Sequence, residues 1–597
     1  MGLLVAMASG KDLDPDTIAG MDAEVRGDWI RAVEAFRRVI AQPEPPRLAR
    51  PRYRAAKKRA LVVYNKEIRR LLKEKRWAEL ADCAACLRLI DPKSSFVKRA
   101  LKACEKQGVA VPTIPPDGEG AHEAFPHRSP GARARSLGAC GSSRTEATRI
   151  IRGCLAFLAG AQKDDGGWDC AAHGGKPQYD VGVTALAVLA LLSDGPEAMQ
   201  GPNAARIDKG IQFMLASKST EGYLGPTRTQ HFIYMHAMAT AALAEYAILS
   251  GKVSALKKEL TAARDLLIRH QTPKSGWGYD TKVGPPDTSA TAWCVFALSR
   301  LELAGVAIPE SAYEGALNWV RKVTDTEFGQ AGYKQKGGAS ARPEGKQDLF
   351  PAEQTQSATA AACLIRALIS PDTIGKTVRG FELIKGTPAA SNNADMYYWY
   401  HAHQAFQAAR GSIPADWYEG LVDALKPHLG EAGAVRPSGP WGDDGGRIYS
   451  TALCALALAA PYRENGPGTG RGKTPSAFLR TGKRTVDMAG WFASVESGIY
   501  VDTGTKLIIR TSGAISPDRK ARPYPPKGIP KGGKARFKDH PYGCLLGRIG
   551  PKGKLFRMPP AGKPMVARSP GHLVFWHNAR PTVSASGSWT IEISLER

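Results

Sequence analysis

The alternation of apolar and polar residues divides this chain of 597 residues into three regions. In the middle region, residues 146–465, apolar residues recur at helical spacing, and one motif returns roughly every fifty residues, which marks a repeated structural unit. Each copy has an amphipathic helix, a turn rich in Gln or Gly with an aromatic residue, and a second helix that is apolar nearly all round. We therefore expect six helix pairs in this region.

The clearest turns run from Gln162 to Trp168 and from Gln271 to Trp277. The second helix of a pair opens on a Thr-Ala pair or a similar one, as at Thr184 and Thr291, and is rich in Ala and Leu. Helices that are apolar all round are buried on both sides, whereas the first helix of each pair carries more charge. Inner and outer helices that alternate in this way predict a closed ring.

Residues 18–108 carry a second helical pattern, which places large and small apolar residues on one face. Its two copies are Gly27 to Phe36, followed by Pro43, and Trp77 to Ala84, followed by Pro92. This pattern resembles the tetratricopeptide repeat (TPR), although the copies lie further apart than its 34-residue period. We predict a TPR-like helical domain.

The pattern changes again after residue 465, where short alternating segments are bounded by Gly, Pro and Ser. Such segments predict the strands of an antiparallel β-sandwich over residues 491–597. The clearest of them are residues 498–501, 506–510, 573–576 and 589–593. Two stretches without periodicity, residues 109–145 and 466–490, are predicted linkers.

The chain is strongly basic, with 82 Lys and Arg against 56 Asp and Glu and a formal net charge of +26. This charge makes an anionic partner physically plausible. Basic residues gather between Arg47 and Arg76 and in a Pro-rich loop at residues 517–534. We interpret the first cluster as a solvated helix face, so a nucleic-acid partner is not expected, although phosphate association stays a third hypothesis.

No apolar run reaches the roughly twenty residues that a membrane span needs. The first residues lack a basic segment and are too short for a signal peptide, so the cytoplasm is favoured over export, and localisation stays open. Cys294, Cys363 and Cys454 follow the repeat Thr at equivalent places and are expected to be small buried apolar residues. The Cys83 and Cys86 pair has no second pair, so a zinc site is not predicted.

The repeats resemble the prenyltransferase and squalene oxidase repeat, the QW motif of squalene-hopene and oxidosqualene cyclases. The stretch from Asp287 to Trp293 looks like the Gln-Thr-Ala-Trp segment of those cyclases. The resemblance covers residues 146–465 and implies an (α/α)6 toroid of the terpenoid cyclase and protein prenyltransferase type. The predicted fold class is therefore multidomain and mainly α, with TPR-like helices before the toroid and a β-sandwich after it.

The resemblance does not supply the chemistry of these families, because fold and function are separable. The chain has no Asp-x-Asp-Asp motif, which furnishes the acid of class II cyclases, no Asp-x-Cys pair for a prenyltransferase zinc, and no thioester motif. Asp287 and Asp395 are the candidate catalytic acids that remain. No cofactor and no metal are predicted.

The starts of the inner helices are expected to line a cavity in the ring. The segments at residues 231–236 and 397–403 combine His with Tyr and Trp, which is unusual for helices otherwise built of Ala and Leu. The predicted lining residues are Tyr179, Asp180, His231, Tyr234, His236, Tyr398, His401, His403, Asp443, Asp444 and Tyr449. Packing within a buried helix is the alternative role for these side chains.

The C-terminal region resembles the calcium-dependent galactose-binding lectin of PA-I type. The matching residues are Gly498 to Tyr500, His540 to Gly550, Asn578 and Ser586 to Trp589. At the places where that family holds calcium with acidic or amide side chains, this chain has Ala579, Ser584 and Ala585. Calcium needs several oxygen ligands, so we expect the sandwich to remain without its calcium-bridged sugar site.

Two functional hypotheses follow. The first is a multidomain binding scaffold for an unknown protein or glycan, because both resemblances lack their reactive or metal-binding residues. The alternative is an isoprenoid-processing enzyme, with Asp287 or Asp395 as an unfamiliar acid and a lipid in the toroid cavity. Whether the chain is an enzyme is left open by the sequence.

Overall fold

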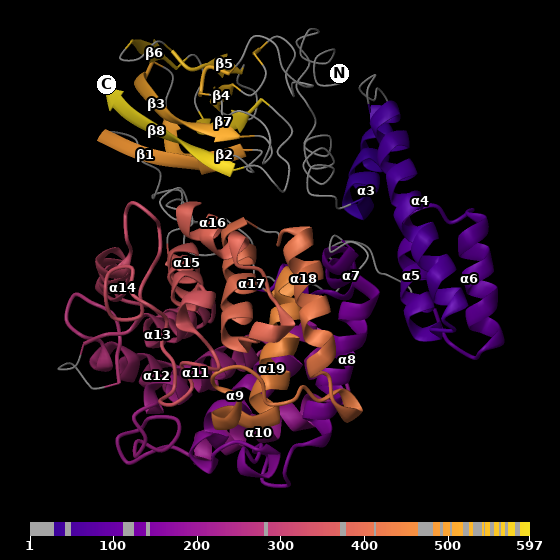
Figure 1. Cartoon of the computed structure of the whole chain (residues 1–597), viewed down its shortest axis with the longest axis vertical. Coiled ribbons are helices and arrows are strands. Elements are labelled where there is room, and N and C mark those ends of the chain that lie inside the picture. Colours follow the sequence, from indigo (N-terminus) through magenta and orange to yellow (C-terminus); the bar gives the residue numbers. More distant parts are fainter. Residues whose placement is uncertain are drawn as a thin grey trace. The chain divides into compact units, whose positions relative to one another are not determined.

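The structure is a computed structural model of the whole chain (Figure 1). It describes residues 29–41, 49–111, 124–138, 144–279, 285–369, 378–410, 413–463, 482–489, 494–501, 504–516, 525–528, 540–541, 544–549, 555–559, 563–567, 571–578 and 586–596. The predicted domain start at residues 18–28, parts of both linkers, most of the 517–534 loop, and the calcium-site positions Ala579, Ser584 and Ala585 lie outside these ranges.

The chain divides into two compact units. One unit, Ile114–Pro371 with Arg379–Arg471, contains the repeat region. The other unit contains Met1–Thr113, Asp372–Val378 and Gly472–Arg597. The boundaries of the five segments predicted from the sequence stay predictions.

The N-terminal part of the second unit is helical. Its helices are α3 (Trp29–Ile40), α4 (Ala49–Lys73), α5 (Trp77–Ile90) and α6 (Ser95–Lys106). Helix α4 contacts all of the other three, and its buried side carries Ala56, Ala60, Tyr64, Ile68 and Leu71. A helical region was predicted here, and the assignment of its helices to the TPR type stays a prediction.

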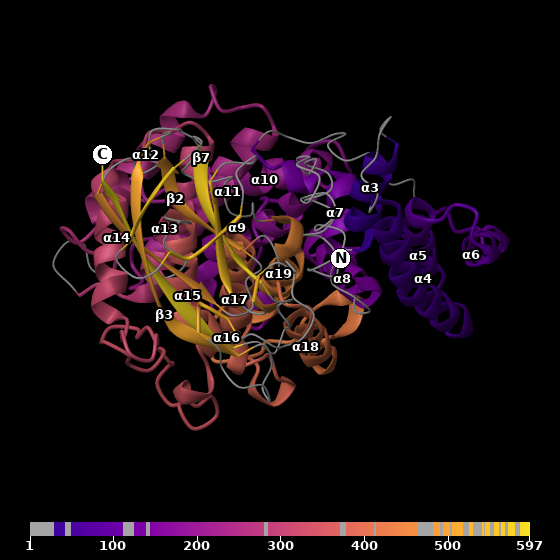
Figure 2. The same ribbon diagram turned by 90° about the horizontal axis from the view of Figure 1, so that it is seen from above.

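Six inner helices of the repeat region form a closed ring among the described residues. They are α9 (Asp180–Leu191), α11 (Phe232–Leu249), α13 (Thr288–Leu303), α15 (Ser357–Ile369), α17 (Met396–Arg410) and α19 (Gly442–Arg463). Each inner helix contacts the next, and α19 contacts α9. Figure 2 shows the labels of these helices around one centre. The helical toroid expected from the sequence is therefore present.

The outer layer of the toroid alternates with the inner one along the chain. It consists of α8 (Arg144–Gly160), α10 (Ala204–Ala216), α12 (Lys257–His270), α14 (Glu310–Val323), α16 (Val378–Gly386) and α18 (Ala415–Leu425). Two further helices, η1 (Pro126–Arg128) and α7 (Pro130–Gly138), precede α8 and contact α19. The inner helices α9 and α11 bury almost every residue, as expected for helices enclosed on both sides.

Two inner segments, Pro177–Met199 and Phe232–Leu249, are long and apolar enough to cross a membrane. They are 83% and 89% buried within the structure. Their apolar surface is therefore already covered by the rest of the toroid.

The repeated turn holds an outer helix to the following inner helix through one set of hydrogen bonds. The indole Nε1 of Trp168 donates to the carbonyl of Leu158 at 2.7 Å, and its backbone N–H donates to Thr184 Oγ1 at 3.0 Å. Trp277 makes the same two bonds, to the carbonyl of Leu267 at 2.7 Å and to Thr291 Oγ1 at 3.0 Å. The Trp and the Thr of the motif are therefore a bonded pair that recurs in different repeats.

The glycine before Trp277 is required by the closeness of this contact. A Cβ atom on Gly276 would lie 2.3 Å from Thr291 Oγ1 and 3.1 Å from the Trp319 ring. Overpacking of this kind costs about 1–3 kcal/mol. We expect Gly276→Ala to lower the free energy of unfolding by that amount in urea titrations. Gly160→Ala, whose Cβ meets nothing within 4 Å, is the control, and equal stabilities of the two variants would contradict the packing argument.

An ionic cluster is buried near the C-terminal ends of several inner helices. Glu245 on α11 lies 2.7 Å from an Arg128 nitrogen, 2.9 Å from one of Arg463 and 3.1 Å from Arg300 Nε. These four side chains are at most 4% exposed. Burial by itself would raise the pKa of Glu245, but Arg128 and Arg463 outweigh it and lower that pKa to about 2. Arg463 also donates to the Leu189 carbonyl near the end of α9, where the helix dipole is negative.

The C-terminal region contains two four-stranded antiparallel sheets, with strand orders β1-β8-β3-β6 and β2-β7-β4-β5. The strands are β1 (Gly482–Ala489), β2 (Ser494–Val501), β3 (Lys506–Ser516), β4 (Leu545–Ile549), β5 (Phe556–Arg557), β6 (Pro564–Val566), β7 (Gly571–His577) and β8 (Ser586–Glu596). The four segments predicted as strands fall within β2, β3, β7 and β8.

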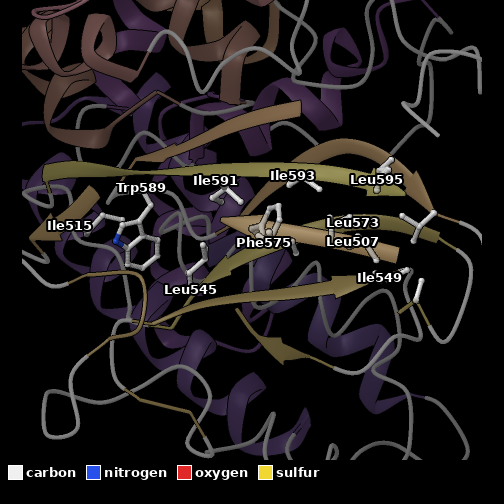
Figure 3. Packing of buried hydrophobic residues seen from close by; sticks show 13 residues of the cluster. Leu507, Ile515, Leu545, Ile549, Leu573, Phe575, Trp589, Ile591, Ile593 and Leu595 are labelled. Carbon is white, nitrogen blue, oxygen red and sulfur yellow. The ribbon is translucent and has the colours of Figure 1, made fainter. Parts of the chain in front are cut away.

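One hydrophobic core draws its residues from both sheets. On β8, Trp589, Ile591, Ile593 and Leu595 are buried at every second position, which is the period of a strand with one covered face. Figure 3 shows these side chains beside Phe575 of β7. The assignment of this region to a lectin-like sandwich stays a prediction.

Candidate functional site

The toroid contains an open cavity of about 130 Å³ where the inner helices begin. Its wall is dominated by aromatic residues, namely Tyr179, Tyr234, Tyr279, Tyr333, Tyr397, Tyr449, Trp441 and His231. The remaining lining residues are Gly182, Val183, Leu186, Met235, Met238, Ser289, Ala341, Asp444 and Gly445.

Several hydroxyl groups of the wall are bonded to one another. The hydroxyls of Tyr279 and Tyr333 lie 2.7 Å apart, and that of Tyr397 bonds to Ser289 Oγ. The Tyr449 hydroxyl has no hydrogen-bond partner within the described part of the chain. The tyrosines are therefore held in fixed orientations around the cavity, and one hydroxyl is available to a ligand.

Asp287 lies behind this wall as the N-cap of α13. One carboxylate oxygen, Oδ1, accepts the backbone N–H of Ala290 at 2.7 Å and the hydroxyl of Tyr234 at 3.1 Å. The other oxygen, Oδ2, is buried without a partner in the described residues. Burial raises the pKa of Asp287 to about 6, although both hydrogen bonds oppose the rise. Burial, followed by the charge of Asp287, also raises the pKa of Tyr234 well above its usual value.

A second carboxyl group, Asp444, lies on the wall itself and forms an ion pair with Lys176. Nearby, the Tyr179 hydroxyl lies 2.7 Å from His231 Nδ1. Burial lowers the pKa of His231, so its imidazole is neutral near pH 7. The cavity is thus bordered by a carboxyl group behind Tyr234 and by another on its surface.

Five of the residues predicted to line a cavity lie on this wall. They are Tyr179, His231, Tyr234, Asp444 and Tyr449. Tyr179 and His231 lie in the turns before inner helices, and the other three lie in the first two turns of α11 and α19. The starts of inner helices are therefore where the cavity is found.

Two predicted carboxyl groups and the second candidate acid lie off the wall. Asp395 caps α17, and its Oδ2 is held by Arg342 at 3.3 Å and Thr355 at 3.2 Å. Asp180 accepts the backbone N–H of Cys170 at 2.9 Å. Asp443 is an exposed residue paired with Lys346. These three carboxylates were expected on the cavity wall. They lie elsewhere, because the side-chain and backbone groups named above hold them.

The remaining predicted residues are packed between helices and do not line the cavity. His236 accepts the backbone N–H of Leu224 at 3.0 Å, and His403 bonds the Ala457 carbonyl at 2.8 Å. Burial lowers the pKa of His236, His401 and His403 to about 4, so these rings are neutral. Tyr398 donates to the carbonyl of Thr387. Each of these four side chains bonds a backbone atom, which agrees with the alternative role of packing within buried helices.

Other wall residues were not predicted from the sequence. Tyr279 follows the repeat Trp by two positions, and Tyr333 lies in the long connection between α14 and α15. Trp441 immediately precedes α19 and Ser289 lies in the first turn of α13. The aromatic pair Trp277 and Tyr279 in one turn was the signal that could have identified the first of these residues.

Among the described residues, no group of three or more His, Cys, Asp or Glu is arranged to hold a metal ion. The nine described cysteines are buried and unpaired in disulfides. Cys83 and Cys86 are thus buried apolar positions, and the site is described by its tyrosines and carboxyl groups.

Comparisons with known proteins give likenesses of structure alone. No family model and no curated protein matches the chain. A solved structure of an inactive variant of the α-1,6-mannanase GH76A of Salegentibacter sp., in complex with α-1,6-mannotriose, is similar over 53% of this chain and 99% of that chain. The TM-score is 0.39 and the sequence identity is 10%.

The leading hypothesis from the sequence was a non-catalytic scaffold, whereas the structure found by comparison is that of an enzyme, a mannanase. The alternative hypothesis was an isoprenoid-processing enzyme, and the structure found by comparison is not that of a terpenoid cyclase either. The cavity adds a feature of the chain itself, a buried carboxyl group with a raised pKa behind its wall.

Proposed function

We propose that the toroid is an enzyme that binds a neutral, hydroxyl-rich substrate in its cavity and transfers a proton through Tyr234 and Asp287. The observation that carries this proposal is the aromatic cavity with a titratable carboxyl group directly behind it. Perturbed carboxyl groups beside a cavity are characteristic of catalytic sites.

The chemistry of the wall favours a carbohydrate as the substrate. Tyrosine and tryptophan rings offer apolar faces with polar edges, which match a sugar ring with its C–H faces and hydroxyl edges. Among the described lining residues there is no Lys or Arg, and His231 is neutral; the ammonium group of Lys334 lies 5.5 Å from the ring centroids of Tyr279 and Tyr333. A neutral sugar fits this combination better than an isoprenyl diphosphate.

The Tyr234 and Asp287 pair supports the role of a general acid. With its pKa near 6, Asp287 keeps a proton to a higher pH than an exposed aspartate. A proton can pass from Asp287 to the Tyr234 oxygen while Tyr234 gives its own proton to a substrate oxygen. Asp444, on the wall, is the candidate second carboxylate, and two carboxyl groups flank the bond that glycoside-cleaving enzymes break.

Calorimetric titration with neutral oligosaccharides, α-1,6-mannotriose among them, tests the binding, and an assay for new reducing ends tests the reaction. Tyr449→Phe removes the one hydroxyl of the cavity wall that has no hydrogen bond among the described residues. We expect it to weaken binding roughly 2- to 10-fold, because one hydrogen bond contributes about 0.5–1.5 kcal/mol.

The matched control is Tyr246→Phe, because the Tyr246 hydroxyl bonds Asp208 and does not line the cavity. This variant should bind the same sugar with unchanged affinity. Failure of the whole panel to bind, together with tight binding of a prenyl diphosphate, would overturn the assignment to carbohydrates.

A further inference from the structure

Helix α4 has one buried face and one basic face. Its buried residues, including Ala56, Tyr64 and Ile68, pack among the N-terminal helices. The opposite face carries exposed basic residues that recur at helical spacing. They are Arg50, Arg54, Lys58, Lys66, Arg69 and Lys73.

These cations have no acidic partner, in contrast to other basic residues of the same helix. Lys57 pairs with Asp91 at 3.2 Å, and Arg70 pairs with Glu67 at 2.6 Å. Within the described chain, no ion pair involves Arg50, Arg54, Lys58, Lys66 or Lys73. Their charges are therefore available to an external anion and repel one another until one is bound.

The length and composition of this face indicate which kind of polyanion it fits. A helix of 25 residues is about 37 Å long, close to the 34–36 Å of one turn of duplex DNA. Val62 is the exposed large apolar residue of this face, and the Phe96 ring is already covered by the Arg69 guanidinium, which lies 4.8 Å from its centroid. The face thus lacks the stacking platform for single strands and the apolar anchors for a membrane.

We propose that this basic face of α4 binds the phosphate backbone of a double-stranded nucleic acid. This binding site goes beyond the proposed activity of the toroid and does not depend on it. Phosphate contacts of this kind position a duplex without reading its sequence. The sequence predicted a solvated helix face here, and this face is exposed. Its basic residues form no ion pairs within the described chain, so an anionic partner would neutralise them.

Fluorescence anisotropy with the full-length chain and a labelled DNA duplex longer than one helical turn tests the proposal. If about five phosphates are neutralised, the logarithm of the binding constant should fall against the logarithm of salt concentration with a slope of about −4 to −5. The triple variant Arg54→Gln, Lys58→Gln, Lys66→Gln should bind at least 10-fold more weakly, and its slope should be shallower by about 3.

The control variant Lys209→Gln, Lys257→Gln, Lys258→Gln removes the same charge from exposed residues of α10 and α12. It should retain nearly all of the affinity and the slope. An equal loss in both variants, no binding by the natural chain, or flotation with anionic vesicles in place of duplex binding would each overturn the proposal. Unchanged circular dichroism of the α4 variant shows that its helices remain folded.

Discussion

Replacing Asp287 by Asn is expected to reduce turnover in the toroid cavity by roughly 10²- to 10⁴-fold, the usual contribution of a general acid. The amide retains an oxygen that accepts the Ala290 N–H, so the N-cap of α13 is kept. It has no acidic proton to pass to Tyr234. Steady-state kinetics on the sugar that binds best would measure kcat, while the binding constant should change little.

Asp395→Asn is the comparison that separates the two acids named from the sequence. Asp395 also caps an inner helix, but Arg342 and Thr355 hold its carboxylate away from the cavity. We expect this variant to keep its turnover once a thermal melt shows that it is folded. Full activity of the Asp287 variant with loss of activity in the Asp395 variant would reverse the assignment.

The pH dependence of turnover should reflect the same carboxyl group. The pKa of Asp287 is raised to about 6, so the acid form is complete well below pH 6 and is lost as the pH rises through 6. The activity of the natural chain should therefore fall on the alkaline side of pH 6, and this limb should be absent from the residual activity of Asp287→Asn.

Replacing Glu245 by Gln should destabilise the toroid by about 3–5 kcal/mol, because three buried guanidinium groups would lose the carboxylate that they share. Its pKa is lowered to about 2, so its stabilising effect is present above the unfolded value near 4.5 and is lost as the pH falls toward 2. Urea titration of the free energy of unfolding at pH 7 measures the effect.

Glu197→Gln is a control with the same chemical change at the surface. Glu197 is paired with Arg133 but is 53% exposed. Exposed ion pairs of this kind contribute about 0–1 kcal/mol. A loss of less than about 1 kcal/mol in the Glu245 variant would show that the helix C-termini, and not Glu245, neutralise the arginines.

The sequence predicts the toroid well because burial imposes a local pattern on every repeat. Thr184 and Thr291 each bond the backbone of a turn, so the same residue recurs at the same place. In α11 the Thr-Ala pair begins at Thr240, whereas His236, one helical turn earlier, bonds the turn through its ring nitrogen. Both positions lie on one face, so only the tertiary contact identifies the residue that is used.

The cavity is less predictable because its polar groups are decided by neighbours far away in the chain. Asp287 and Asp395 both cap an inner helix, and the sequence gives no means of ranking them. Tyr234, from the preceding inner helix, contacts the first, and Arg342, from a long connection, contacts the second. Function was mispredicted because the absence of the family motifs was taken as the absence of any catalytic activity. A resemblance of fold does not justify that conclusion.

The contact between α9 and α19 has a consequence for biosynthesis. The first inner helix acquires its second neighbour only when the chain has been translated as far as Arg463. Until then, the nascent polypeptide presents an uncovered apolar flank at each end of the growing series of hairpins. Such surfaces are prone to aggregation, so this protein should depend on chaperones during its synthesis more than a protein built of local contacts.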